Sequence, residues 1–251
     1  MKYLTILTGA SRGMGLGLAE QLCTPDAVLL CISRATSPGL DQYATQRGAR
    51  LTQWSADLGD PIPVATRLQA WLTAQNPGAL ASATLINNAG MIGRMGPLDP
   101  ADAQTLAMTL RVDLEAPMQL TAAFLSATRA WTLPRRILNI SSGLGRRPIA
   151  GGAMYCAAKA GMDHFSRCVA LDEAGQANGV RIVSLAPGII DTDMQADLRA
   201  SDPARFPGRD GFVQAKESGD LTSPGAAARR VLAYLARADF GSLPVADVRD
   251  A

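Results

Sequence analysis

Short apolar runs alternate with longer segments of helical periodicity over almost the whole chain. The apolar runs predict strands near residues 3–8, 27–33, 50–55, 83–87, 136–141, 180–186 and 241–246. The periodic segments predict helices near residues 14–23, 62–75, 101–112, 114–130, 154–177 and 223–237. Regular alternation of this kind requires crossover connections and a parallel sheet that is covered on both faces. The pattern therefore predicts an α/β fold, a doubly wound parallel sheet of about seven strands with helices on both faces.

The chain contains no internal repeat, low-complexity tract or linker, so we expect residues 1–251 to form one domain. Charged residues make up 18% of the chain and the formal net charge is +2, which does not favour a nucleic-acid partner. No apolar run reaches the roughly 20 residues of a membrane span. The N-terminal sequence does not resemble a signal peptide. We expect a cytoplasmic protein that does not bind a membrane.

The cysteines show no spacing typical of metal ligands, and we predict no metal site. We expect them to be reduced thiols that pack as small apolar residues, with a role beside Tyr155 as the less favoured alternative for Cys156. They are Cys23, Cys31, Cys156 and Cys168.

A glycine-rich turn follows the first predicted strand and reads Thr8-Gly9-Ala10-Ser11-Arg12-Gly13-Met14-Gly15. Glycines let the backbone approach a pyrophosphate closely, and the helix that follows supplies free N–H groups and a positive dipole. We predict a dinucleotide site here, with simple strand-to-helix packing as the alternative. Its predicted cofactor contacts are Gly9, Ser11, Arg12, Gly13, Met14 and Gly15.

The end of the second predicted strand indicates which dinucleotide binds. An NAD site carries an acidic residue about 20 positions after the glycines, where it holds the ribose 2′-hydroxyl. Here the strand ends in Ser33-Arg34, with no acid at that place. An arginine accommodates a 2′-phosphate instead, and Arg12 adds a second cation. We therefore predict NADP(H) as the cofactor, although either arginine alone also fits a solvated surface.

The third and fourth predicted strands end in polar residues, each with two alternative roles. Asp57-Leu58 follows the third strand and is predicted near the adenine, where Asp57 accepts from the amino group or stabilises a turn. The fourth strand ends in Asn87-Asn88-Ala89-Gly90. This segment either seats the cofactor, through Asn87, Ala89 and Gly90, or ties neighbouring strands together.

A serine, a tyrosine and a lysine in the second half of the chain predict a catalytic centre. Ser142 lies at the carboxyl end of a predicted strand, where open α/β sheets bind ligands and its hydroxyl can bind a substrate carbonyl oxygen. Tyr155 and Lys159 lie four residues apart in an alanine-rich helix, so they share one face. A cation about 4 Å away favours the phenolate by roughly 4 kcal/mol, or about three pKa units, before desolvation is subtracted.

The lysine is therefore expected to make Tyr155 a working acid or base at neutral pH. A tyrosine and a lysine at this spacing also occur on solvated helix faces, and the other motifs in the chain favour the catalytic interpretation. His164 is the single histidine and lies off the face of Lys159, so we expect packing or an interface role for it.

The order and spacing of the motifs resemble those of the short-chain dehydrogenase/reductase family over residues 3–195. The resemblance implies a Rossmann-type sheet and a homodimer or homotetramer. It implies that Tyr155 is the acid/base, that Lys159 binds the nicotinamide ribose and that Ser142 orients the substrate. It also implies that Thr192 contacts the carboxamide, in a cofactor-binding segment that includes Pro187, Gly188 and Ile190. The matching motifs are Thr8-Gly9-x-x-x-Gly13-x-Gly15, Asn87-Asn88-Ala89-Gly90, Ser142, Tyr155-x-x-x-Lys159 and Pro187-Gly188.

One catalytic position departs from the family. Many members carry an asparagine in the helix before the catalytic strand, where this chain has Asp113. In the family this residue contributes mainly through its backbone carbonyl, which holds a water that leads to the lysine. Pro117 lacks an N–H group and cannot close the helical hydrogen bond to the Asp113 carbonyl. We predict that the relay survives and that Asp113→Asn changes turnover only mildly.

The segment Ala186–Gln195 resembles sepiapterin reductases and their bacterial diketone-reducing relatives. In sepiapterin reductases an aspartate in the C-terminal segment anchors the pterin through both carboxylate oxygens. Asp247 is the matching residue here and Asp250 is the second choice, with a frayed and solvated terminus as the alternative. The predicted substrate contacts are therefore Ser142, Tyr155 and Asp247.

Together these features predict an NADPH-dependent carbonyl reductase. The preferred substrate is a pterin with a 1,2-dicarbonyl or α-hydroxyketone side chain, and aromatic diketones or 3-oxoacyl thioesters are the alternatives for the same residues. A non-catalytic NADPH-sensing regulatory protein is the alternative of another class, although a sensor needs only the glycine turn and Arg34.

Residues 196–222 are polar and contain several prolines and glycines, which predicts an irregular segment with short helical turns. Because it follows the cofactor-binding strand, we expect this segment to form a lid over the substrate.

Overall fold

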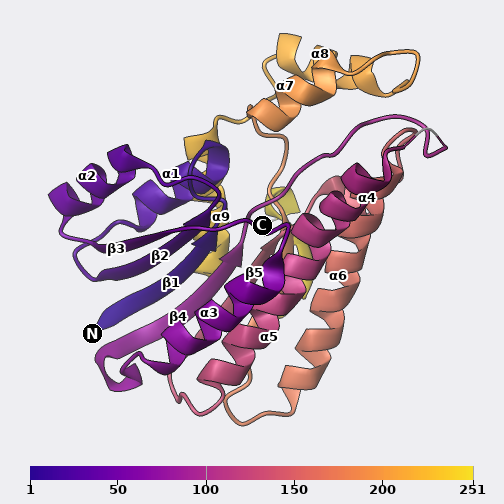
Figure 1. Cartoon of the computed structure of the whole chain (residues 1–251). Helices are drawn as coiled ribbons and strands as arrows, with labels where there is room; N and C mark the ends of the chain where they lie inside the picture. The colour runs from indigo at the N-terminus through magenta and orange to yellow at the C-terminus, as the bar shows by residue number, and fades with distance from the viewer. Residues whose placement is uncertain (100, 251) are drawn as a thin grey trace.

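The computed structural model describes residues 1–99 and 101–250. In this part of the chain seven strands form one parallel sheet in the order β3-β2-β1-β4-β5-β6-β7 (Figure 1). This confirms the predicted sheet. The strands are β1 (Lys2–Thr8), β2 (Ala27–Ser33), β3 (Arg50–Ser55), β4 (Leu80–Asn87), β5 (Arg135–Ile140), β6 (Arg181–Ala186) and β7 (Val245–Asp247).

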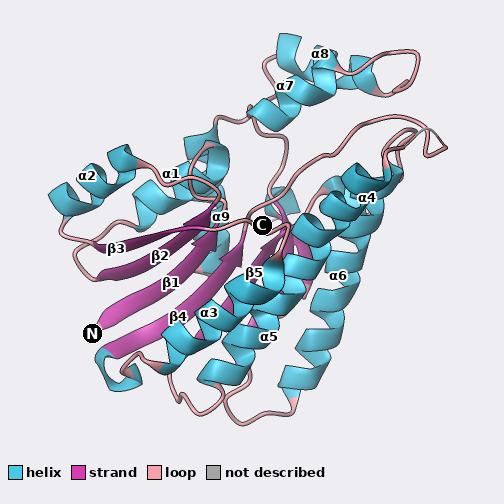
Figure 2. Cartoon of the chain, viewed as in Figure 1, coloured by secondary structure: helices cyan, strands magenta, loops and turns pink. Residues whose placement is uncertain are grey.

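The sheet forms a central layer with helices on both sides (Figure 2). α3, α5 and α6 cover one face, and α1, α2 and α9 cover the other. The α-helices are α1 (Gly13–Leu22), α2 (Pro38–Arg47), α3 (Pro61–Thr73), α4 (Ala103–Leu110), α5 (Ala116–Thr128), α6 (Ala153–Ala174), α7 (Asp193–Ala200), α8 (Arg209–Glu217) and α9 (Pro224–Leu235). None of these described helices is long and apolar enough to cross a bilayer.

The strand residues alternate between the two cores because successive side chains point to opposite faces of a sheet. Leu4 and Ile6 of β1 belong to the core beneath α3 and α5, whereas Leu7 belongs to the core beneath α1 and α9. β1 lies between β2 and β4, so the strand order reverses there. In sheets of this kind the crevice at the carboxyl ends of the strands next to such a reversal is the usual ligand site.

The sequence-based prediction missed one helix and misplaced one strand. α2 (Pro38–Arg47) was not predicted because only Leu40 and Ala44 are buried, too few to give an apolar period. The last strand is β7 (Val245–Asp247), three residues long, rather than 241–246. Gly241 has a φ of 91°, and the Ser242 N–H donates to the Asp239 carbonyl at 2.9 Å, so the chain turns where the strand was expected.

The predicted break between two helices at Asp113 is instead a continuous helix with one widened turn. A π-helical turn, η2 (Arg111–Glu115), joins α4 directly to α5. The Ala116 N–H donates to the Arg111 carbonyl, five residues back. The turn widens immediately before Pro117, which has no N–H and whose ring would crowd the carbonyl four residues back. Asp113 lies in the middle of this turn and is fully buried.

The segment after β6 contains more helix than the sequence indicated. α7 and α8 stand above the carboxyl edge of the sheet (Figure 1). Thr192 precedes α7, and the loop to α8 buries Phe206 completely. Three short 3-10 turns complete the described elements, η1 (Pro77–Ala79), η3 (Gly143–Gly145) and η4 (Val248–Asp250).

The expectation that the cysteines pack as apolar residues holds for Cys23 and Cys31 but is wrong for Cys168. Cys23 and Cys31 are buried, and burial raises the pKa of the Cys31 thiol to about 12. Cys156 is partly exposed and Cys168 is exposed on the outer side of α6. The helical pattern alone did not indicate which face of α6 carries Cys168.

Candidate active site

The three predicted catalytic side chains meet at the carboxyl end of β5. Ser142 lies two residues beyond the strand, and α6 carries Tyr155 and Lys159 on the face that packs against it. Lys159 is 3% exposed, and its Nζ donates to the Ile140 carbonyl at 3.1 Å. The Lys159 Nζ lies 5.6 Å from the centre of the Tyr155 ring. One helix face and one strand end therefore hold all three groups together.

The electrostatics of Tyr155 differ from the sequence prediction. Burial raises the pKa of Tyr155 above its ordinary value of 10.0, and this effect exceeds the lowering by Lys159. The carboxylate of Asp113 raises the pKa further, while the Ser142 hydroxyl lowers it. Lys159 lowers the pKa of Tyr155 as predicted, but burial outweighs this effect, so the net shift is upward and not downward. At neutral pH the phenol keeps its proton.

The side chain of Asp113 contacts two residues of the candidate site. Its Oδ1 accepts from the Met91 N–H at 2.9 Å and lies 3.9 Å from the Lys159 Nζ. Its Oδ2 is buried and has no hydrogen-bond partner among the described residues. Burial raises the pKa of Asp113, against the opposing effects of Lys159 and the Met91 N–H. A Cβ on Gly90 would lie 2.9 Å from the Asp113 Oδ1, so only glycine fits beside this carboxylate.

The glycine turn forms a backbone cradle at the carboxyl end of β1. Gly9 has a φ of 69°, and a Cβ there would lie 2.8 Å from the Ala89 Cα. A Cβ on Gly15 would lie 1.9 Å from the Gly9 carbonyl oxygen. Arg12 is the N-cap residue of α1, and among the described residues no side chain caps the free N–H groups of that helix. These N–H groups remain available to an anion.

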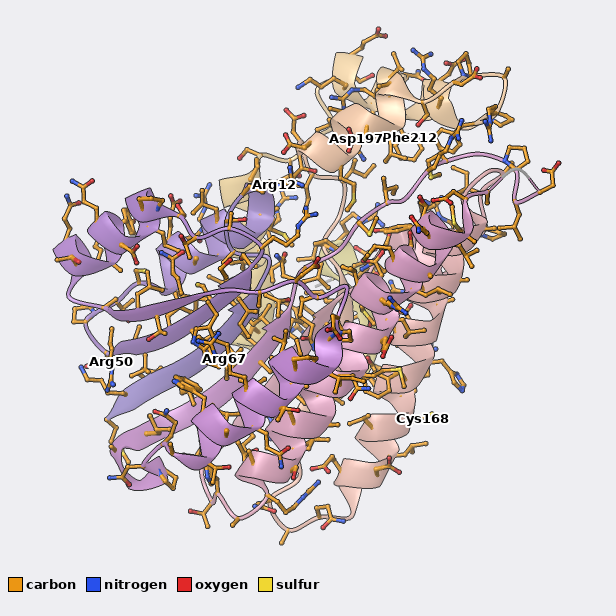
Figure 3. The ribbon with its side chains drawn as sticks, viewed as in Figure 1. Arg12, Arg50, Arg67, Cys168, Asp197 and Phe212 are labelled. Carbon is orange, nitrogen blue, oxygen red and sulfur yellow. The ribbon has the colours of Figure 1, made fainter. Side chains whose placement is uncertain are left out.

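The residues predicted to select the cofactor lie along the same edge. Arg34 is exposed just beyond β2, and the Ser33 hydroxyl accepts from the Ala10 N–H at 2.8 Å. Arg12 lies below the lid (Figure 3), and its Nη1 donates to the Asp193 Oδ2 at 2.9 Å. Arg12 is therefore paired with the first residue of α7, which the sequence did not indicate.

Asp57 and the asparagines of β4 stabilise the local backbone. The Asp57 Oδ1 accepts from the Gly59 N–H at 2.9 Å, and Leu58 is buried in the core. The Asn87 Nδ2 donates to the Asn139 Oδ1 at 2.8 Å, and the Asn88 Nδ2 donates to the Thr8 carbonyl at 2.9 Å. Side chains therefore tie the strands together, and cofactor contacts by Asp57, Leu58, Asn87, Ala89 and Gly90 stay predictions.

The segment after β6 passes close to the glycine cradle. Pro187 is buried, Gly188 has a φ of 86°, and Ile190 pairs with Thr222 in an isolated bridge. A Cβ on Gly13 would lie 3.4 Å from the Thr192 Cγ2, so Thr192 lies beside the turn. Cofactor contacts by Pro187, Gly188, Ile190 and Thr192 stay predictions, and Met14 points into the core beneath α1.

An apolar cluster lies over Tyr155. Ile92 and Met95 come from the loop after β4, and Leu198 and Phe206 come from the segment of the predicted lid. An adjoining cavity of about 370 Å³ opens toward the lid, where Figure 3 labels Asp197 and Phe212. The cavity is lined by Ile92, Gly93, Arg94, Met95, Asp197, Ser201, Asp202 and Arg205.

Comparison with known proteins identifies the family. A profile of the family described as short chain dehydrogenase matches residues 4–203. A benzil reductase ((S)-benzoin forming) from Bacillus cereus is 35% identical, over 96% of both chains. A sepiapterin reductase from Meriones unguiculatus is 34% identical, over 94% of this chain and 92% of that one. The crystal structure of a short-chain dehydrogenase/reductase from Burkholderia vietnamiensis is 32% identical over the full length of both chains, with a TM-score of 0.64.

The chain belongs to the short-chain dehydrogenase/reductase family. It is an oxidoreductase that acts on carbonyl or alcohol groups.

Asp247, the aspartate predicted to bind the substrate, forms an ion pair with Arg249. β7 pairs with β6 in a register that sets Asp247 beside Ala186, next to the predicted cofactor-binding segment. The Arg249 Nε donates to the Asp247 Oδ1 at 2.8 Å, and the Arg249 Nη2 donates to the Asp247 Oδ2 at 2.6 Å. These hydrogen bonds lower the pKa of Asp247. Asp250, the second choice, is exposed.

Sequence reasoning missed the residues that surround Tyr155 in this dehydrogenase. Ile92, Met95 and Phe206 lie far from Tyr155 along the chain, and only the fold brings them together. The apolar side chains in the otherwise polar lid segment, Leu198, Phe206 and Phe212, were the signal available for them. His164 is exposed on α6.

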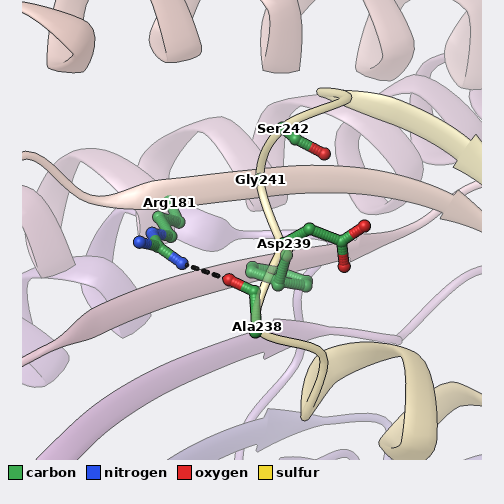
Figure 4. A pocket seen from close by; sticks show the side chains of 6 residues that line it. Arg181, Ala238, Asp239, Gly241 and Ser242 are labelled. Carbon is green, nitrogen blue, oxygen red and sulfur yellow. Dashed lines mark hydrogen bonds between the residues drawn. The ribbon is translucent and has the colours of Figure 1, made fainter.

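A second cavity of this dehydrogenase, of about 280 Å³, lies at the opposite edge of the sheet. It is formed by Arg181 at the start of β6 and by the turn before β7 (Figure 4). The Arg181 Nη1 donates to the Ala238 carbonyl there at 2.9 Å. Since the catalytic residues lie at the carboxyl ends of the strands, this cavity is separate from the active site.

Proposed function

We propose that the protein is an NADPH-dependent carbonyl reductase whose preferred substrate is an apolar aromatic 1,2-diketone. The observation that supports this most is the arrangement of Ser142, Tyr155 and Lys159 beneath an apolar cluster at the carboxyl end of β5. A serine hydroxyl, a buried phenol and a lysine together suit proton delivery to a carbonyl oxygen.

The cofactor crevice fits a dinucleotide phosphate. The backbone cradle around Gly9 and Gly15 leaves no room for a Cβ, and the uncapped start of α1 offers N–H groups to a pyrophosphate. Arg34 at the end of β2 supports NADPH over NADH, because its guanidinium suits the 2′-phosphate. When bound, NADPH supplies the hydride for the carbonyl carbon.

The protein's own groups handle the proton. The Ser142 hydroxyl binds the substrate oxygen, and Tyr155, whose pKa burial raises, holds a proton at neutral pH and donates it to that oxygen. Lys159, fixed by the Ile140 carbonyl, stabilises the phenolate that results. Asp113 holds the Met91 backbone and balances the charge of Lys159.

Two observations favour the aromatic diketone over the pterin preferred from sequence. Ile92, Met95 and Phe206 surround Tyr155 with apolar side chains that offer no hydrogen-bonding groups, which suits an apolar substrate better than a polar one. Both oxygens of Asp247 are occupied by Arg249, so a pterin edge would have to displace that guanidinium. The relation to a benzil reductase agrees with this preference.

A pterin side chain remains the second candidate because of where Asp247 lies. The register of β7 pairs Asp247 with Ala186, the residue before the predicted cofactor contacts Pro187 and Gly188. The relation to sepiapterin reductases supports this candidate as well. A 3-oxoacyl thioester and an NADPH-sensing regulatory protein are weaker alternatives, since neither explains the apolar cluster over an intact Ser142, Tyr155 and Lys159.

We also propose a homodimer or homotetramer, supported by apolar side chains on the outer faces of neighbouring helices. Met118 of α5 is 42% exposed and Leu171 of α6 is 77% exposed, and a second copy would cover both.

The test is NADPH oxidation, followed by absorbance, with benzil and with sepiapterin. The wild type is compared with Tyr155→Phe. We expect a higher kcat/KM for benzil and its loss in Tyr155→Phe. A higher kcat/KM for sepiapterin, lost in Asp247→Ala, would replace the diketone by the pterin. NADPH binding without turnover of any carbonyl would favour the regulatory alternative.

A further inference from the structure

The end of β5 is joined to α6 at every residue from Asn139 to Ser142. Three of the four links are hydrogen bonds, and the fourth is the approach of the Ser142 hydroxyl to the Tyr155 phenol. The links are Asn139 Nδ2 to Ser166 Oγ at 2.9 Å, Lys159 Nζ to the Ile140 carbonyl at 3.1 Å, Ser141 Oγ to Asp163 Oδ1 at 2.6 Å, and Ser142 to Tyr155.

Asp163 extends the catalytic face of α6 by one turn. It lies four residues after Lys159 and eight after Tyr155, so the three side chains lie on the same side of the helix. Its carboxylate is 3% exposed and faces the neighbour of Ser142 instead of the substrate crevice. The reaction described above gives this buried acid no role.

Three donors converge on the Asp163 carboxylate. The hydroxyls of Ser141 and Ser184 each donate to Oδ1 at 2.6 Å, and the Arg146 Nε donates to Oδ2 at 3.1 Å. A carboxylate that accepts several donors, one of them a guanidinium, makes strong bonds of fixed geometry. Asp163 therefore joins the end of β5 to β6 and to the loop after η3.

Arg146 carries the same network to the last strand. Its Nη2 donates to the Ala246 carbonyl of β7 at 2.8 Å. Ser141 and Arg146 are the two ends of the short segment that contains Ser142, and Asp163 binds both of them. Within the segment, a Cβ on Gly145 would lie 2.9 Å from the backbone carbon of Lys159, so this turn rests directly on α6.

We infer that Asp163 is a positioning residue for Ser142, acting with Arg146 to clamp both ends of the segment that carries the catalytic hydroxyl. The inference rests on the proposed role of Ser142. Asp163 touches neither substrate nor cofactor. A buried ion pair such as Asp163 with Arg146 adds little to the stability of a fold. It is better suited to holding neighbouring side chains in one geometry.

A double-mutant cycle tests the inference. Asp163→Asn keeps the size of the side chain but removes the charge and turns one acceptor into a donor. We expect kcat for benzil to fall about thirtyfold while the Kd for NADPH changes less than about twofold. In a Ser142→Ala background the same change should lower kcat less than about threefold, because the hydroxyl that Asp163 positions is absent.

The matched control is Asp172→Asn, an exposed acid on the same helix, which should leave kcat unchanged in both backgrounds. Ser141→Ala removes a single donor and serves if Asp163→Asn does not fold. It should lower kcat in the same direction, by a smaller factor. Equal losses in the wild-type and Ser142→Ala backgrounds would overturn the inference, since Asp163 would then act on the fold alone.

Amide hydrogen exchange gives a readout that does not need turnover. In the NADPH complex, Asp163→Asn should speed exchange in residues 141–147 and leave β1 unchanged. If the wild type reduces no carbonyl, the proposed function fails. The clamp still stands in that case if residues 141–147 exchange faster in Asp163→Asn than in the wild type. Unchanged exchange in residues 141–147 would contradict the clamp whatever the activity.

Discussion

The active site is assembled from two regions of opposite character. The platform, formed by Asn139–Ser142 and α6, holds its side chains by buried hydrogen bonds. Lys159 and Asp163 are only 3% and 2% exposed. The region of the predicted lid, which contains α7, α8 and the loop with Phe206 between them, is held at its edges by exposed ion pairs, such as Arg12 with Asp193, whose side chains are 68% and 72% exposed.

The difference follows from what each region does in the proposed reaction. Proton transfer needs donor and acceptor fixed to within a fraction of a bond length, and buried hydrogen bonds provide this. Substrate entry needs a segment that can open, and exposed ion pairs contribute little to holding it closed. The apolar contact of Phe206 with the cluster over Tyr155 is where the lid meets the platform.

The largest effect is expected from the platform itself. Tyr155→Phe removes the proton donor and keeps the ring, so kcat for benzil should fall by at least about 100-fold, within the 10²–10⁴ typical of acid catalysis. The Kd for NADPH and the Tm should stay close to those of the wild type. Tyr43→Phe on α2 is the control. A loss smaller than about tenfold would show that another group supplies the proton.

The contact between lid and platform should give the next largest effect. Phe206→Ala removes a fully buried aromatic ring from the cluster over Tyr155. We expect kcat/KM for benzil to fall roughly thirtyfold, the equivalent of about 2 kcal/mol of lost apolar contact. Phe212→Ala changes a partly buried neighbour and should cost less. Equal losses from the two variants would show that the substrate does not lie against Phe206.

Local pattern was sufficient to predict the sheet and to bring Ser142, Tyr155 and Lys159 to one place. Continuous apolar runs revealed β1 and β2, and the spacing of Tyr155 and Lys159 on one helix set their common face. Both signals depend on residues close together in the chain. The order of the glycine turn, Ser142, Tyr155 and Lys159 then indicated the family.

Long-range contacts determined what the sequence did not predict. The raised pKa of Tyr155 results from burial by segments that precede and follow it in the chain, such as those of Ile92 and Phe206. The network at Asp163 joins donors from three separate elements. The spacing of apolar residues in a helix indicates which face of the helix is buried. It does not indicate which charged groups from other segments pack against that face.

A smaller effect is expected where a charge beside the platform changes but the shape of the side chain does not. Asp113→Asn keeps an acceptor for the Met91 N–H, so kcat should fall less than about tenfold. The Asp113 carboxylate raises the pKa of Tyr155, so its removal lowers that pKa. The phenol then loses its proton at lower pH, and the alkaline fall of kcat should move to lower pH than in the wild type.

The measurement is the pH profile of kcat at saturating NADPH, with Asp172→Asn as the control for a charge change on the protein surface. A loss of more than about 100-fold, roughly 3 kcal/mol, would show that the carboxylate itself is needed. A fall of kcat that moves to higher pH would contradict the assignment of that limb to Tyr155.

The smallest effect is expected at the edge of the lid. Asp193→Asn breaks the exposed ion pair with Arg12, and exposed pairs contribute little to stability, so kcat and Tm should barely change. The change also frees Arg12, which lies beside the glycine turn, to bind a 2′-phosphate. The Kd for NADPH should therefore fall by about twofold while the Kd for NADH stays constant, and added salt should remove the difference. Tighter binding of both cofactors would mean that Asp193 acts through the lid and not through Arg12.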